Sequence, residues 1–390
     1  MSFVSGCIIV TRMDNFKRVR AEFCSISMVD LYKTLKYFME APSVTGFEQQ
    51  RRERIIEVFS KYCDSVTVDV MGNVIGVIGD GERDVMLAGH YDQLGFMISH
   101  VDDDGFAGFK QVGGWDKRVA YGTRVKIWTG DGPEDYIVGA VAVKAAHLTD
   151  AKERDKSPEL KDMLLDLGLD SKKEAEKLGI KSGTVCTPYL DVTRLGTKDS
   201  DKLVGPAFDD VCCVAGLVKT MEILSKNPPK NIKVHFVATV QEEIGLRGAT
   251  IAAYNIKPWA AIATDVTHAV APGVKPNEVG GIKIGKGPVV ALGGNFTRAL
   301  WEMMESSAEK NGIPCQRQGV PNRSGTDAWA IQVERGGTIC GLISMPNRYM
   351  HSPNEVISLQ DLENLGSLIA ATVQALGESD LEHNVEVYRR

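Results

Sequence analysis

Two adjacent carboxylates, Glu242 and Glu243, follow an apolar run at residues 236–240. Such a run predicts a buried strand, so the two acids stand where the strand leaves its sheet. A sheet core does not tolerate unpaired charge, because taking a carboxylate out of water is costly unless it gains a partner. The pair therefore requires something that stabilises the negative charge or a reaction that uses it.

Two further apolar runs end on side chains that could do chemistry. His90 and Asp92 stand two residues apart at the end of the run MLAG, so they share one face of a strand. A carboxylate beside a histidine is the arrangement that fixes the ring of a metal-bound imidazole. Taken alone, the pair is as typical of a structural strand end as of a site. Asp265 ends the run AIAT in the same way.

Two more candidates come from a helix start and from a later loop. Asp209 and Asp210 directly precede the helical pattern CVAGLVKTMEIL, where an N-cap explains one aspartate and leaves the second without a role. His351 follows the apolar run CGLISMP. Taken singly, each of these residues is at least as consistent with a solvated loop charge or a structural histidine as with a site.

Considered jointly, the candidates indicate a metal centre. Sites in open α/β sheets form beyond the carboxyl ends of strands, where His90, Glu243 and Asp265 all stand. Two histidines, two aspartates and one glutamate suit a pair of divalent ions such as zinc, manganese or cobalt. One glutamate of the adjacent pair would then bind metal, and its neighbour would act as a base toward the bound water.

The elements that must position these residues alternate along the chain. From about residue 28, after a possible tail at 1–27, two amphipathic helices are broken at Pro42 and Gly46. SVTVDVMGNVIGVIG predicts a strand pair, and DVMLAGHYDQLGFMIS predicts one more strand. The β-rich runs NIKVHFVATV, WAAIATDV and TICGLIS then alternate with helical patterns. This order predicts an α/β fold, with a mixed sheet covered by helices on both faces.

Residues 101–204 break this rhythm. They carry short glycine-punctuated strands, FAGFKQVGGW, RVKIWTG and YIVGAVAV, followed by a highly charged stretch. We expect a small β-rich domain inserted into the α/β domain, which would comprise residues 1–100 and 205–390.

Composition restricts the classes of function. The chain has 390 residues, more than one domain usually needs. Its formal charge of −6 offers no basic surface for a phosphate backbone, so nucleic-acid partners are not expected. No apolar run approaches the roughly 20 residues of a membrane span. The eight cysteines contain no CxxC pair, which favours a reducing, cytoplasmic setting.

Seven segments together carry a specific resemblance: GHYDQLGFMI, VGGWDKRV, FDDV, QEEIGLRGA, TDVTHA, SGTDAWAI and MHSPNEVI. On these segments, and over nearly the whole chain from about residue 28 to 376, the sequence resembles the co-catalytic metallo-aminopeptidases that assemble into tetrahedral dodecamers. That family includes glutamyl, leucyl and deblocking aminopeptidases and members once called cellulase M.

The resemblance implies a ligand set for two divalent ions in each chain, zinc first and cobalt or manganese as alternatives. His90, Asp209 and Asp265 would hold one ion. Asp209, Glu243 and His351 would hold the other, with Asp209 bridging the two.

The resemblance also implies roles around the metals. Glu242 would be the general base, and Asp92 would orient the region of His90. The peptide bond between Asp209 and Asp210 is often cis in relatives. The inserted domain would be PDZ-like and would mediate the dimerisation from which a homo-oligomeric dodecamer is built.

Two departures from the family pattern bear on the site and on the assembly. Val211, Cys212 and Cys213 stand where the family has Arg, any residue and Gly. Alanines at 145 and 146 replace a proline pair before His147. Neither change removes an expected ligand, but both bear on ion pairing near the site and on contacts between subunits.

The predicted function is therefore removal of the N-terminal residue from peptide substrates by a dinuclear metal centre. A related deacylase or carboxypeptidase would need a cationic pocket that the sequence does not identify. A non-catalytic metal-binding scaffold would have no need of Glu242. A glycosidase would require two free carboxyl groups flanking the bond, and metal-bound carboxylates cannot serve as acid or nucleophile.

Overall fold

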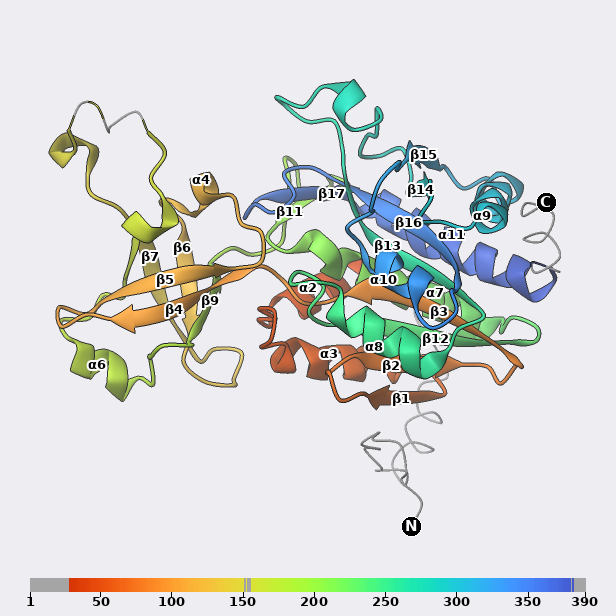
Figure 1. The fold of residues 1–390 in the computed structure, drawn as a ribbon, viewed down its shortest axis with the longest axis horizontal. Helices are drawn as coiled ribbons and strands as arrows, with labels where there is room; N and C mark the ends of the chain where they lie inside the picture. Colours follow the sequence, from red (N-terminus) through yellow and green to blue (C-terminus); the bar gives the residue numbers. More distant parts are fainter. Residues whose placement is uncertain (1–27, 151, 153–155, 380, 382–390) are drawn as a thin grey trace, which may run out of the picture.

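The computed structural model describes residues 28–150, 152, 156–379 and 381. An α/β body and a separate β-rich unit lie side by side along the longest axis of the molecule (Figure 1). The expected tail at residues 1–27 lies outside the described residues. Among the described helices, none is long and apolar enough to cross a membrane.

The body is organised around a mixed sheet of eight strands, in the order β1-β2-β12-β3-β13-β16-β14-β15. The neighbours β12, β3, β13 and β16 run parallel, whereas β1, β2 and β14 add antiparallel pairings toward the two edges. The strand bounds are β1 Ser65–Val68, β2 Val74–Ile78, β3 Arg83–His90, β12 Ile232–Thr239, β13 Ala260–His268, β14 Val289–Leu292, β15 Gln316–Gly319 and β16 Ile339–Asn347.

Helices cover both faces of this sheet, as the alternating pattern predicts. On β3, Val85 and Leu87 join one hydrophobic core, and Met86 and Ala88 join the core on the opposite face. The first core packs against α2 (Leu31–Met39), α3 (Gln49–Phe59), α7 (Phe208–Lys226), α9 (Arg298–Lys310) and α11 (Leu359–Gly377). The second packs against α8 (Arg247–Ile256) and α10 (Asp327–Val333). The α/β/α prediction is confirmed.

One predicted strand is in fact two strands in different sheets. The segment DVMLAGHYDQLGFMIS divides into β3, which ends at His90, and β4 (Gly95–Val101), which belongs to the second unit. Between them the chain leaves the ladder, because the Gln93 N–H donates to the Ser43 carbonyl rather than to a strand. The polar stretch HYDQ at residues 90–93 marks the junction in the sequence, but only the strand pairing shows that β3 and β4 belong to different sheets.

The second unit is a closed barrel, in the order β4-β5-β8-β7-β6-β9. Its further elements are β5 Phe106–Val112, α4 Lys117–Ala120, β6 Arg124–Trp128, β7 Tyr136–Ala142, β8 Leu164–Asp166, α6 Lys172–Lys177 and β9 Val185–Pro188. The barrel has its own hydrophobic core, which includes Phe96, Val125 and Leu165. The β-rich inserted unit expected from the sequence is therefore present.

The barrel strands run from residue 95 to residue 188, whereas the expected insertion ran from 101 to 204. At the far end, β10 (Thr193–Arg194) pairs with β11 (Lys202–Gly205), and β11 pairs with β17 (Glu355–Ser358) of the body, which gives a three-stranded sheet. This sheet holds the chain returning from the barrel next to the start of α7.

Close packing of α7 against α11 provides a test of the body. A Cβ atom on Gly366 would lie 2.6 Å from the Lys219 Cβ and 2.7 Å from the Gly216 carbonyl oxygen. Helix propensity alone would make Gly366→Ala stabilising by about 1 kcal/mol. We expect the clash to reverse that sign and lower the free energy of unfolding by about 1 to 3 kcal/mol, measured by urea denaturation.

The matched control is Ser367→Ala on the same helix, where the hydroxyl donates to the Glu363 carbonyl at the exposed surface. Its stability should stay within about 0.5 kcal/mol of the unsubstituted chain. A Gly366→Ala variant as stable as the control would contradict the packing argument.

Candidate functional site

The candidate residues converge at the carboxyl edge of the central parallel strands. His90 is the last residue of β3, and it pairs in register with Thr239, the last residue of β12. Glu242 and Glu243 follow β12, and Asp265 lies near the end of β13 on the other side of β3. Parallel neighbours that end at the same edge explain why residues so distant in sequence meet here.

Two triads of potential ligands share one aspartate. His90, Asp209 and Asp265 form one group, and Asp209, Glu243 and His351 form the other, with ligand atoms within 4.8 Å of one another in each group. Asp209 uses a different oxygen for each side. Its Oδ1 lies 3.1 Å from the His90 Nε2, and its Oδ2 lies 3.2 Å from the His351 Nε2.

The shared aspartate is presented by an irregular helix start. Asp209 and Asp210 have non-helical backbone angles inside the segment assigned to α7, and the peptide bond between them is cis. The cis bond agrees with what the family resemblance implies. Both side chains are buried between the helix and the sheet edge, so Asp209 faces the histidines rather than solvent.

Asp92 fixes the backbone of the glutamate pair through hydrogen bonds. Its Oδ1 accepts a hydrogen bond of 3.0 Å from the Glu242 backbone N–H, and its Oδ2 accepts from the Glu243 N–H at 3.3 Å and from the Thr45 hydroxyl at 2.8 Å. The contact with His90 runs mainly through the backbone, since the Asp92 carbonyl lies 3.1 Å from the His90 Nδ1. Asp92 thus fixes the glutamate pair as well as the histidine.

These contacts orient the two histidine rings. A carbonyl oxygen only accepts, so Nδ1 of His90 donates to the Asp92 carbonyl, and Nε2 faces Asp209, to which it donates when the ring is protonated. His351 follows the same rule, because its Nδ1 lies 3.1 Å from the Gly114 carbonyl of the barrel. Both imidazoles therefore present Nε2, the nitrogen that a metal ion would need.

Glu355 is a site residue that the sequence reasoning missed. Its Oε2 accepts from the Asp209 backbone N–H at 2.9 Å, and its Oε1 accepts from the His351 N–H at 3.0 Å. One buried carboxylate thus joins two segments that supply ligands. The available signal was a glutamate at the start of the apolar run EVIS, four residues after His351.

Asp327 is a second missed residue, at the start of α10. It is buried, and its Oδ2 accepts a hydrogen bond of 2.6 Å from the Thr239 hydroxyl at the end of β12. Burial raises the pKa of Asp327 to about 6. It was present in the SGTDAWAI segment, but an aspartate at a helix start has an ordinary explanation as a cap.

Burial dominates the electrostatics of the carboxylates. Desolvation raises the pKa values of Glu242, Glu243 and Asp265 well above the ordinary range, and neighbouring carboxylates add to the effect. Burial would also raise the pKa of Asp209, but hydrogen bonds from His351 and His90 outweigh it and hold that pKa below its usual range. The hydrogen bond with Asp209 in turn raises the pKa of His351 to about 9.

This donor set fits divalent cations. Within the described residues, the close ion pairs of Asp209, Glu242 and Glu243 are with histidines, and none is with lysine or arginine. The Oε1 of Glu243 is buried without a hydrogen-bond partner. A buried, unpaired oxygen is costly unless a ligand satisfies it. Imidazole and carboxylate groups are also the ligands that zinc takes in catalytic sites.

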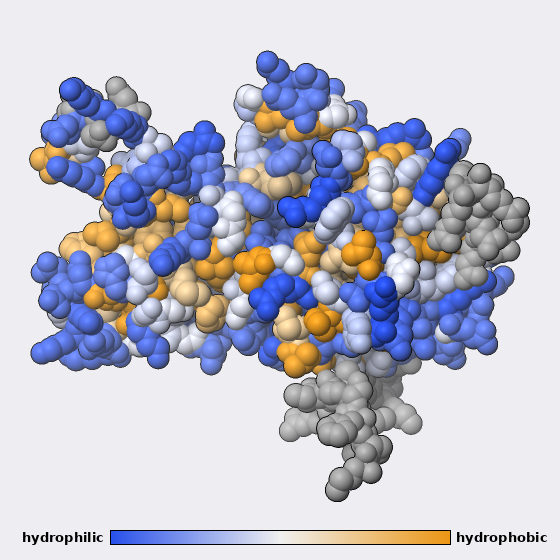
Figure 2. Space-filling model, viewed as in Figure 1, coloured by the Kyte–Doolittle hydropathy of each residue, from blue (hydrophilic) through white to orange (hydrophobic). Residues whose placement is uncertain are grey.

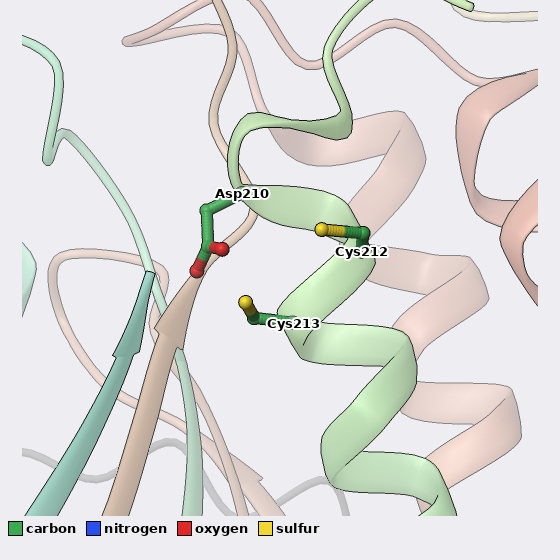
Figure 3. Close-up of side chains that lie close together, drawn as sticks. All are labelled: Asp210, Cys212 and Cys213. Atoms are coloured by element: carbon green, nitrogen blue, oxygen red, sulfur yellow. The ribbon is translucent and has the colours of Figure 1, made fainter. Parts of the chain in front are cut away.

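The three residues that depart from the family pattern lie in the hydrophobic core next to the site. Val211, Cys212 and Cys213 are fully buried in the core at the start of α7. In Figure 3 the Cys213 sulfur points toward the Asp210 carboxylate. The Asp210 Oδ2 accepts from the His90 backbone N–H at 3.1 Å. The substituted positions therefore pack against the element that carries His90 and displace no ligand.

Asp210, Cys212 and Cys213 also meet the spacing of a ligand group, but the two thiols lie in the apolar core. Burial raises the pKa of Cys213 well above its ordinary value, which keeps the thiol neutral. We assign this cluster to packing.

The match with known proteins is extensive. Residues 72–368 match the family described as M42 glutamyl aminopeptidase. The lysyl aminopeptidase of Pyrococcus furiosus is 33% identical over 90% of this chain and 99% of its own length. A TET aminopeptidase structure from a marine sediment archaeon of the Thaumarchaeota superposes with a TM-score of 0.85 at 31% identity, covering 90% of this chain and 98% of that one.

A third relative forms large assemblies. The structure of the Pyrococcus horikoshii TET1 peptidase, which can form a tetrahedron or a large octahedral shell, gives a TM-score of 0.77 at 32% identity. It covers 88% of this chain and 99% of that one. These matches confirm the resemblance drawn from the seven sequence segments. The chain belongs to the M42 glutamyl aminopeptidase family and is a peptide hydrolase.

Proposed function

We propose that this protein is an aminopeptidase with two divalent cations, zinc in the first place, held by the two triads that share Asp209. His90 and Asp265 would complete the first ligand set, and Glu243 and His351 would complete the second. The observation that carries the proposal is the use of separate Asp209 oxygens, one toward each histidine. A carboxylate with one oxygen on each side is the bridging element of two-metal hydrolases.

Side chains of the protein would supply the catalytic functions that the metal ions do not. Two bound cations would supply Lewis acidity and a water of lowered pKa. Glu242 is buried, lies 3.8 Å from the His90 Nε2 through its Oε2, and is left outside both triads. We assign it as the general base that accepts the proton of the attacking water and passes it to the leaving amine. Asp92 holds the backbone of this base in place.

The substrate would be the N-terminal end of a peptide, as in the aminopeptidases that the chain resembles. A pocket lined by Leu94, Trp115 and Pro206 opens beside Asp209 and Glu243.

We also propose a reducing compartment such as the cytoplasm, supported by the six cysteines among the described residues, all of which are free thiols.

Assembly into dimers, and from dimers into a dodecamer, would use the barrel. Phe106, Val138 and Leu164 are exposed on the neighbouring strands β5, β7 and β8. Figure 2 shows hydrophobic surface over the barrel. An exposed apolar face on adjacent strands is typical of a surface that a second copy covers. The tetrahedral and octahedral assemblies of the Pyrococcus horikoshii relative support this proposal.

The shared ligand generates a test by metal content. Asp209→Ala should lose both ions, whereas His90→Ala should weaken mainly one, because only Asp209 belongs to both triads. The measurement is metal per chain after dialysis against a weak chelator, followed by thermal unfolding with and without added zinc. Full metal content in Asp209→Ala would refute the bridging role.

The adjacent glutamates generate a kinetic test. Glu242→Gln preserves size but removes the base, so metal content should survive while kcat falls by about 10² to 10⁴. Glu243→Gln should lower metal occupancy first, with activity partly restored by added zinc. Both variants should be compared on one leucyl peptide, with metal analysis. Normal turnover by Glu242→Gln would reverse the assignment of the pair.

The exposed barrel face generates a test of assembly. The intact chain should scatter light as a particle far heavier than its 42.5 kDa mass. Val138→Asp combined with Leu164→Asp should reduce the particle mass, because buried unpaired charge opposes association. Tyr254→Asp is the control, since Tyr254 is exposed on α8, away from the barrel. A chain that is monomeric at every concentration would defeat the proposal.

A further inference from the structure

The proposed base is carried by a short loop between β12 and α8. Residues 240–248 follow the end of β12 and enter the first turn of α8, and Glu242 and Glu243 lie within them. The loop turns back on itself, because the Gly248 N–H donates to the Val240 carbonyl at 3.0 Å. Its two ends therefore lie next to each other, and a contact that fixes both ends also fixes the position of the base.

The turn of a neighbouring hairpin lies beside these two ends. β2 pairs antiparallel with β12, with Val74 opposite Ala238, so the start of β2 lies at the carboxyl edge of β12. Asn73 stands one residue before Val74, in the turn that joins β1 to β2, and it is fully buried. The strand pairing thus brings a turn residue next to the loop that carries the base.

The carboxamide of Asn73 bonds to both ends of the loop. Its Oδ1 accepts from the Val240 N–H at 3.0 Å, and its Nδ2 donates to the Gly248 carbonyl at 3.0 Å. Nδ2 also donates to the Asp69 Oδ2 at 2.6 Å. These partners allow one orientation of the amide, because an oxygen in place of Nδ2 would face two groups that only accept.

Asp69 fixes the turn that carries Asn73. Its Oδ1 accepts the backbone N–H groups of Met71, Gly72 and Asn73 at 2.9, 3.0 and 3.1 Å. The Tyr91 hydroxyl donates to the Gly72 carbonyl at 2.7 Å, which ties the turn to the segment after β3. The amide of Asn73 therefore projects from a turn whose own position is set by several hydrogen bonds.

The contact between the turn and the loop is close. A Cβ atom on Gly248 would lie 2.4 Å from the Asn73 Oδ1 and 2.6 Å from the Val240 N, so only glycine lets the backbone approach this far. In the middle of the loop, Asp92 accepts the backbone N–H groups of the two glutamates. Two buried side chains thus fix the loop, Asp92 at its middle and Asn73 at its ends.

We propose that Asn73 is a positioning residue for the general base, because it fixes both ends of the loop at residues 240–248 and so the place of Glu242 relative to the attacking water. The inference rests on the proposed role of Glu242. Asn73 belongs to neither ligand triad, and the hydrogen bonds printed by its amide lead to Asp69, Val240 and Gly248. It therefore acts through the backbone of the loop.

The test is Asn73→Ala, assayed on the tripeptide Leu-Gly-Gly with zinc in excess. We expect kcat to fall about 10- to 100-fold with KM within about twofold, because a displaced base slows proton transfer without removing a substrate contact. Added to Glu242→Gln, Asn73→Ala should change kcat by less than about twofold, since an absent base cannot be displaced. An unchanged kcat in the single variant, or an equal further decrease in the double variant, would overturn the proposal.

Hydrogen exchange, followed by mass spectrometry, provides a readout that needs no turnover. Peptides covering residues 240–248 should exchange about 5- to 50-fold faster in Asn73→Ala, the effect of losing a few buried hydrogen bonds. The matched control is Thr220→Ala, which removes a buried hydroxyl that donates to the Gly366 carbonyl at 3.1 Å. That control should lower Tm and leave both kcat and exchange of the loop unchanged. Unchanged exchange in Asn73→Ala would contradict the proposal.

Asn73→Asp decides the question if the alanine variant does not fold. It keeps the size of the side chain and an acceptor toward Val240, but it removes both donors. The same decrease in kcat and faster exchange are expected, and normal values of both would refute the proposal. Failure of the unsubstituted protein to cleave any peptide would instead refute the aminopeptidase proposal, and hydrogen exchange would still decide whether Asn73 fixes the loop.

Discussion

Buried negative charge at one edge of the sheet is the constraint on which the rest of the structure depends. Asp92, Asp209, Glu242 and Asp265 are all buried there. Like charges in a low-dielectric interior repel strongly and lack the solvation that water would provide. Such a cluster is stable only where hydrogen-bond donors or positive charges offset the repulsion and the lost solvation of the carboxylates. The surrounding elements supply those donors and charges.

Compensation comes first from the backbone. Asp92 and Glu355 each accept two backbone N–H groups, and in both cases those groups belong to candidate ligands or to the proposed base. One carboxylate thus fixes the end of β12, and the other ties the start of α7 to the loop carrying His351. The two histidines then supply further stabilisation, and the remaining demand for positive charge is what suits the edge to divalent cations. Fixed positions of the ligands follow from the same hydrogen bonds.

The barrel also contributes contacts to the site at the edge of the sheet. Its loop at residues 113–115 orients the ring of His351 through the Gly114 carbonyl, and Trp115 lines the pocket. The three-stranded sheet returns the chain from the barrel to α7 and includes β17, which begins at Glu355. The unit that we propose to mediate assembly is therefore also connected, through the contact between Gly114 and His351, to the residues proposed to do the chemistry.

Much of the fold and of the candidate site could be predicted from local sequence patterns. The mixed sheet with helices on both faces, the β-rich insertion and the candidates His90, Asp209, Glu243, Asp265 and His351 could all be predicted from the sequence. Each of these residues stands where an apolar run or a helical pattern meets a polar side chain, and both periodicity and strand ends are local properties of the chain. The family resemblance then supplied the division of the glutamate pair into a ligand and a base.

Only the tertiary structure decided the contacts made across the chain. The break between β3 and β4 lies at the polar residues 90–93, but a polar stretch does not say which sheet each strand joins, and that follows only from their pairing with different partners. Glu355 stands in the segment MHSPNEVI, but a glutamate at a strand start has an ordinary structural explanation, so its role was not predicted. Its importance lies in the hydrogen bonds that it accepts from the backbone of Asp209 and of His351. These contacts depend on how β17 is placed beside the start of α7, which no local pattern encodes.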